Sequence, residues 1–115
     1  MSRARWHILR DGAQITLARH VPPRFDFAVR TTLGAGDPIR LAHQIRQDLW
    51  RALQAMRGFS PVVRLAPSGQ GWGVIAGGRA MGPVPAALRV VAQNVLDHPQ
   101  NRARWVRYAA RGHRS

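Results

Sequence analysis

The 115-residue sequence contains no cysteine, no lysine and no glutamate. The absence of cysteine excludes a disulfide framework, a thiolate metal site and a cysteine nucleophile. The absence of glutamate leaves five aspartates as the carboxylate side chains. Four of them match ordinary structural positions: Asp11 in a turn, Asp26 on an outer strand face, Asp37 before a helix and Asp48 on an exposed helix face. A paired-carboxylate catalytic site is therefore not expected.

Long apolar runs are also missing. The longest, such as residues 83–88, are far shorter than the ~20 residues that a membrane-spanning helix needs. The first ten residues are rich in arginine and lack the apolar core of a secretory signal. We therefore expect a cytoplasmic protein without a membrane span.

The basic residues are abundant and of one kind. All 18 are arginine and face five acidic residues, which gives a formal net charge of +13. GC-rich coding DNA explains arginine in place of lysine, but not the excess of positive charge, because aspartate remains freely available. A charge of this size raises the affinity for polyanions. The composition therefore predicts an acidic partner.

The first third of the chain has the two-residue alternation of β-strands. Strands are expected over residues 4–9 and 14–19, joined by a turn at Asp11-Gly12. The most regular alternation covers residues 25–33. One side of this strand is expected to carry Phe25, Phe27, Val29, Thr31 and Leu33. The other side carries Asp26, Ala28, Arg30 and Thr32.

The pattern then becomes helical over residues 38–57, with Asp37 as N-cap, Pro38 at the first position and Gly58 as the stop signal. Its apolar face is predicted to hold Leu41, Ala42, Ile45, Leu49, Ala52, Leu53 and Met56. Strands are expected over 61–66 and 72–76, with a turn between them and a loop over 77–85. A second helix follows, with Val84, Leu88, Val91 and Val95 on one face, and a last short helix covers 101–111.

This order predicts a single α+β domain over residues 1–115, with a mainly antiparallel sheet of four to five strands and two long helices on one face. Residues 1–21 form an N-terminal β-hairpin. Residues 25–98 form a βαββα core that contains most of the ferredoxin-like plan. Residues 99–115 form a basic C-terminal helix or tail.

Enzyme signatures are absent. The five histidines lack metal-ligand spacing, and no serine lies in a nucleophile-elbow pattern. The strand-to-helix loop at 33–38 lacks the further glycine of a dinucleotide fingerprint and the lysine of a P-loop. We expect no enzymatic activity, no cofactor and no bound metal.

The arginines favour a nucleic-acid-binding module, with RNA or single strands preferred. If the helices cover one sheet face, the other presents guanidinium groups at strand spacing, suited to phosphates and to stacking on bases. The candidates are Arg5, Arg24, Arg30 and Arg64 on the sheet, and Arg102, Arg104, Arg107 and Arg111 in the C-terminal segment. Trp6 and Trp72 are candidate stacking surfaces, but a one-residue shift of register sends either side chain into the core. The core is favoured for Trp6, and Trp72 stays open.

Two alternatives remain. In the first, the chain is a protein–protein adaptor or small subunit that docks on an acidic partner through Arg46, Trp50, Arg57 and Trp105. In the second, the basic C-terminal segment attaches to an anionic membrane surface. For that segment, the simplest structural interpretation docks Trp105 and Val106 on the domain and leaves the arginines in solvent.

Overall fold

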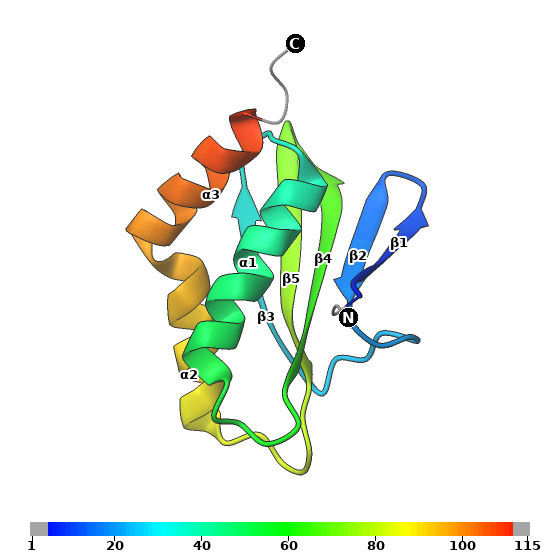
Figure 1. Cartoon of the computed structure of the whole chain (residues 1–115). Helices are drawn as coiled ribbons and strands as arrows, with labels where there is room; N and C mark the ends of the chain where they lie inside the picture. Colours follow the sequence, from blue (N-terminus) through cyan, green and yellow to red (C-terminus); the bar gives the residue numbers. More distant parts are fainter. Residues whose placement is uncertain (1–4, 112–115) are drawn as a thin grey trace.

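A β-hairpin is the first element of the described chain, as the alternation predicts (Figure 1). The computed structural model describes residues 5–111. Strand β1 (His7–Asp11) pairs antiparallel with β2 (Gln14–Ala18). Gly12 in the turn has a φ of +62°, a conformation that glycine adopts at little cost. Ile15 and Leu17 of β2 enter the core, so Gln14 and Thr16 belong to the opposite face.

Strand β3 (Phe27–Leu33) follows an irregular segment that contains two prolines. Phe27, Val29 and Leu33 are buried and Arg30 is exposed, which confirms the predicted alternation. The prediction for Phe25 is wrong, because this residue precedes the strand and its ring lies by the Arg64 guanidinium on the other face.

The sheet has five antiparallel strands in the order β1-β2-β4-β5-β3. Strands β4 (Ser60–Ser68) and β5 (Gly71–Arg79) form a hairpin in the centre, and both are longer than predicted. Gly77 and Gly78, predicted to lie in a loop, belong to β5. A Cβ atom on Gly77 would lie 2.1 Å from the Phe27 carbonyl oxygen, so the glycine permits close approach of β3.

Helix α1 (Pro38–Leu53) connects β3 to β4 and packs on the sheet. Its N-cap is confirmed, since the Ile39 N–H donates to Asp37 Oδ1 at 2.9 Å. The helix ends at Leu53 rather than at the predicted Arg57. Ala52 lies within the helix but is exposed, so its predicted place on the apolar face is wrong. Five residues of the predicted apolar face are buried: Leu41, Ala42, Ile45, Leu49 and Leu53.

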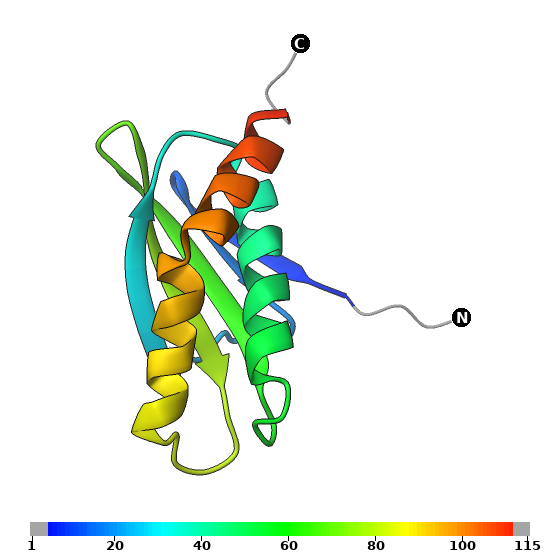
Figure 2. The same ribbon diagram turned by 90° about the vertical axis from the view of Figure 1, so that its left-hand side faces the viewer.

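Helices α2 (Ala86–Asp97) and α3 (Pro99–Arg111) complete the chain. Val84, Leu88 and Val95 of the predicted face pack against the core, but Val91 is 36% exposed. The buried residues of α2 are Ala92 and Leu96, so the face that meets the core is shifted from the predicted one around the helix. All three helices lie on the same side of the sheet (Figure 2). The other side, which we call the open face, is covered by none of the helices that the structure describes in residues 5–111. None of the helices described within residues 5–111 is long and apolar enough to span a bilayer.

Candidate functional site

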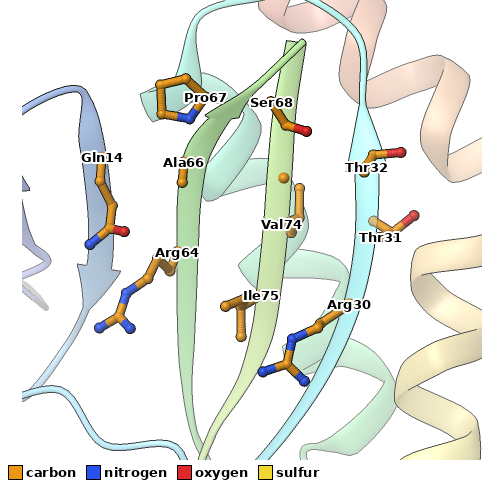
Figure 3. A pocket seen from close by; sticks show the side chains of 11 residues that line it. Gln14, Arg30, Thr31, Thr32, Arg64, Ala66, Pro67, Ser68, Val74 and Ile75 are labelled. Carbon is orange, nitrogen blue, oxygen red and sulfur yellow. The ribbon is translucent and has the colours of Figure 1, made fainter.

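Strand register places two arginines in one row across the open face. Arg64 on β4 lies opposite Ile75 on β5, and Ile75 lies opposite Arg30 on β3. Thr16 on β2 continues the row beyond Arg64. Because neighbouring strands are about 4.8 Å apart, the backbones at Arg30 and Arg64 are separated by about 10 Å. An isoleucine side chain therefore lies between two guanidinium groups (Figure 3).

The open face is hollowed beside this row. We call the hollow, of about 530 Å³, the sheet groove. Figure 3 shows the arginines along one stretch of the groove and Pro67 and Ser68 farther along it. Its lining consists of Gln14, Arg30, Thr31, Thr32, Arg64, Ala66, Pro67, Ser68, Gly73, Val74 and Ile75. The groove thus combines cationic groups, hydroxyl and amide side chains, and a floor of small or apolar residues.

The Arg64 side chain is held in place on two sides. Its Nε donates a hydrogen bond to Thr16 Oγ1 at 3.0 Å, and Thr16 is only 3% exposed. Its guanidinium carbon lies 5.4 Å from the centre of the Phe25 ring, within the range of a cation–π contact. These contacts use Nε and one face of the Arg64 guanidinium group. The terminal nitrogens of Arg64 remain as donors for a ligand.

Arg30 is exposed at the edge strand of the sheet. Its backbone carbonyl accepts a hydrogen bond from Gln93 Nε2 of α2 at 3.0 Å. This contact fixes the backbone from which the side chain extends, while the guanidinium points over the groove (Figure 3). Among residues 5–111, no carboxylate forms an ion pair with Arg30 or Arg64.

Three of the five aspartates form ion pairs elsewhere. Asp37 lies 3.8 Å from Arg40, and Asp48 contacts Arg104 and Arg51. Asp26 accepts hydrogen bonds from Arg24 at 2.8 and 2.9 Å. These bonds, and that from the Ala80 N–H, hold the pKa of Asp26 below its usual range. Within the part of the chain that the structure describes, these pairs leave Arg30 and Arg64 without a counterion.

The structure does not bring the other predicted sheet arginines into the groove. Arg24 is held by Asp26 and lines a separate hollow with Arg79 near the start of β4. Arg5 is exposed and lies ahead of β1. Of the four sheet candidates, only Arg30 and Arg64 lie together.

The arginines of α3 have different environments. Arg102 donates to Thr31 Oγ1 at 2.8 Å, and also to the Leu96 and Thr32 carbonyls. Arg104 contacts Asp48, so both side chains connect parts of the fold. Arg107 is exposed. The side chain of Arg111 lies outside what the structure describes.

The residues predicted for a protein interface do not form one surface. Trp105 is fully buried, as the docked interpretation of the C-terminal segment predicts, and its Nε1 donates to Asp48 Oδ2 at 2.6 Å. Arg46 and Trp50 lie on an exposed flank of α1 and line one pocket. Arg57 is exposed beyond the end of that helix and does not line the pocket.

Neither candidate stacking tryptophan lies in the sheet groove. Trp6 packs against the core and contacts His43 of α1 edge-on, with ring centres 6.3 Å apart. Trp72 also packs against the core, and its Nε1 donates to the Gly36 carbonyl at 3.0 Å. The favoured core position of Trp6 is confirmed, and the open choice for Trp72 is resolved toward the core.

Several groove residues were not predicted. Gln14 of the groove, and Thr16 in the row beside Arg64, alternate with the apolar Ile15 and Leu17, and this alternation was a usable signal for their outward position. Ile75 gave no such signal, because an apolar residue in a central strand is expected to face the core. Its position on the open face follows from pairing with Arg64 and Arg30.

No group of three or more potential metal-ligating side chains occurs within the described part of the chain. Comparison of the sequence with protein-family models and curated proteins, and of the fold with solved structures, finds no match.

Proposed function

We propose that the protein is a small, basic, non-enzymatic module that binds nucleic acid through the sheet groove. The observation that carries the proposal is the placement of Arg30 and Arg64 on either side of Ile75, on a face that no helix covers. Guanidinium groups bind phosphate oxygens through paired N–H donors. Two such groups without carboxylate partners form a site for successive backbone phosphates.

The shape of the groove favours RNA or single strands. The floor of the groove is formed by Ile75, Ala66 and Gly73, whose side chains are apolar or absent. Sugars or bases can lie on this floor. Thr32, Ser68 and Gln14 add hydrogen-bonding groups along the path. The groove lining contains no aromatic ring, so we expect backbone contacts to supply most of the affinity. Sequence preference should then be weak.

The overall charge supports the same partner. With 18 arginines and five aspartates, the chain attracts polyanions over a long range. The exposed Arg107 of α3 and Arg5 ahead of β1 are candidates for peripheral contacts to a longer strand. We also propose that residues 25–98 form a ferredoxin-like core and that a basic C-terminal helix follows it.

One observation favours a second function, that of an adaptor for an acidic protein. Trp50 is 42% exposed although its ring stacks on Phe59, with centres 6.2 Å apart. Arg46 lines the same pocket. An exposed tryptophan beside an arginine is typical of an interface hot spot.

A salt titration tests the nucleic-acid proposal. Binding of a fluorescent single-stranded RNA of mixed sequence is measured by anisotropy from about 50 to 200 mM salt. The double variant Arg30→Gln/Arg64→Gln should weaken binding at least tenfold at the lower salt concentration. It should also make the log–log salt slope shallower by about 1.4, since each phosphate contact to a single strand contributes about 0.7.

The matched control is Arg57→Gln/Arg89→Gln, which removes the same charge from exposed positions outside the groove. We expect the control to lose less than threefold in affinity. Equal losses of affinity in the two double variants would show that only the net charge matters, and would overturn the assignment of binding to the groove. A partner retained after nuclease treatment and lost with Trp50→Ala would establish the adaptor instead.

A further inference from the structure

A further pocket lies on the helix side of the sheet, where the start of the described chain and the end of β2 meet α1, and it adjoins the hollow lined by Arg24 and Arg79. It has a volume of about 390 Å³, in the range of small-molecule sites. Trp6, Arg19, His20, Arg46, Trp50 and Ser60 contribute to its wall. We call it the flank pocket. It shares no lining residue with the sheet groove.

Two guanidinium groups converge on the flank pocket without a counterion. Neither Arg19 nor Arg46 forms an ion pair within residues 5–111. Burial and the nearby charge of Arg19 both lower the pKa of Arg46. Two like charges held at one site favour a bound anion, because the anion offsets both the mutual repulsion and the lost hydration.

Three aromatic rings also line the pocket, those of Trp6, Trp50 and Phe59. The Arg46 guanidinium carbon lies 4.5 Å from the centre of the Trp6 ring, so the cation is stacked rather than extended into solvent. Phe59 supports one face of the Trp50 indole at an interplanar angle of 8°, which leaves an exposed part of this ring at the pocket. Indole and guanidinium planes are surfaces on which a base can stack.

Ser60 also lines the pocket, but its hydroxyl group is shielded. Its Oγ is shielded from solvent and has no hydrogen-bond partner among the described residues. A buried hydroxyl without a partner costs free energy. Because this hydroxyl is not accessible, a ligand in the pocket would be recognised by the cations and rings of the wall.

From these features we infer that the flank pocket binds a nucleoside phosphate, with the base against the indole and guanidinium planes and the phosphate on Arg19 and Arg46. The ligand is either a free nucleotide or the phosphorylated end of a strand, since both present the same chemistry. This site is independent of strand binding in the sheet groove.

Tryptophan fluorescence tests the inference, because Trp6 and Trp50 both line the pocket. The full chain is titrated separately with adenosine 5′-monophosphate, adenosine and inorganic phosphate. Saturable quenching by the monophosphate, at least tenfold tighter than with adenosine or phosphate, is expected. Equal binding of adenosine or of phosphate would overturn the joint recognition of ring and charge.

Four variants assign the site. Arg19→Gln and Arg46→Gln should each raise the Kd of the monophosphate about tenfold, the loss of roughly one charge-assisted contact. Trp50→Ala should weaken binding similarly, while Trp50→Phe should retain most of it. Arg19 is exposed, so Arg19→Gln tests the pocket even if Arg46→Gln disturbs packing. Arg89→Gln is the charge-matched control and should leave the Kd unchanged.

Further arms separate this site from the sheet groove and identify the source of the ligand. Arg30→Gln/Arg64→Gln should leave monophosphate binding unchanged, and loss of binding there would overturn the flank assignment. A short oligonucleotide with a 5′ phosphate that competes better than its unphosphorylated form would identify a strand end. Competition by neither form, with monophosphate binding intact, would identify a free nucleotide. An acidic peptide that binds with Trp50-dependent affinity, while the monophosphate does not bind, would overturn the inference in favour of the adaptor.

Discussion

Trp105 Nε1 of α3 donates a hydrogen bond to Asp48 Oδ2 of α1 at 2.6 Å, with the indole fully buried. The same carboxylate contacts Arg104 and lies 3.8 Å from Arg51 at its other oxygen. One acidic side chain, only 13% exposed, thus joins α1 to α3 through two donors, the Arg104 guanidinium and the Trp105 indole. The acid that looked from the sequence like an exposed helix residue is therefore structural.

Asp48→Asn should lower the free energy of unfolding by about 1.5–3 kcal/mol, the range for hydrogen bonds to charged groups. The neutral amide removes the ionic partner of Arg104 and weakens the bond to the Trp105 indole. The urea midpoint measures the change. Asp97→Asn is the control, since Asp97 is exposed and accepts from Gln93 Nε2 at 3.1 Å. Equal effects of the two substitutions would contradict the proposed role of Asp48.

Arg102→Gln should affect stability more than nucleic-acid binding. The side chain donates to Thr31 and to two carbonyls, one of them Thr32 O on the edge strand β3. Its loss should cost about 2 kcal/mol because these acceptors lose their partner. It should also speed amide exchange along β3. Arg107→Gln removes the same charge from an exposed position and should change stability by less than about 0.5 kcal/mol. The opposite ranking would show that Arg102 is not needed to hold the β3 edge.

Two glycines of β5 should differ sharply on substitution by alanine. A Cβ on Gly77 would lie 2.1 Å from the Phe27 carbonyl oxygen, so Gly77→Ala should cost about 3 kcal/mol or more. A Cβ on Gly73 meets its nearest atoms at 3.7 Å. Gly73→Ala should therefore stabilise the strand by about 0.5 kcal/mol while adding a methyl group to the groove. Thermal unfolding of both variants measures the difference, and similar melting temperatures would be the contrary result.

The sequence predicted features that depend on near neighbours in the chain. The N-cap at Asp37, the alternation around Arg30 and the turn at Gly12 depend on a few consecutive residues, and the structure confirms them. Local patterns failed where a segment distant in the sequence packs closely against the backbone. Gly77 suggested a loop from composition alone, yet it lies in β5 because β3 packs closely against it.

The candidate sites show the same division. Outward positions for Arg30 and Arg64 followed from alternation within each strand, but their alignment across Ile75 follows from strand register. In the flank pocket, Arg46 and Trp50 are four residues apart on one helix, so their proximity was predictable. Arg19 comes from another segment, and nothing in the local sequence connects it to Arg46.

Below neutral pH, His43 should make stability depend on pH. Burial lowers the pKa of its imidazole from 6.5, and the charge of Arg46 lowers it further. Arg46 Nε also donates to His43 Nδ1 at 3.4 Å, a bond that a protonated imidazole cannot accept.

The unfolded chain therefore binds this proton at a higher pH than the folded chain does. The free energy of unfolding should fall as the pH drops below about 6.5, and this contribution should level off once the pH is below the folded-state pKa. Urea midpoints between pH 7.5 and 5 measure the change. His43→Gln should flatten the profile in this window, whereas His7→Gln, at an exposed position of β1, should not. A profile that survives His43→Gln would place the titrating group elsewhere.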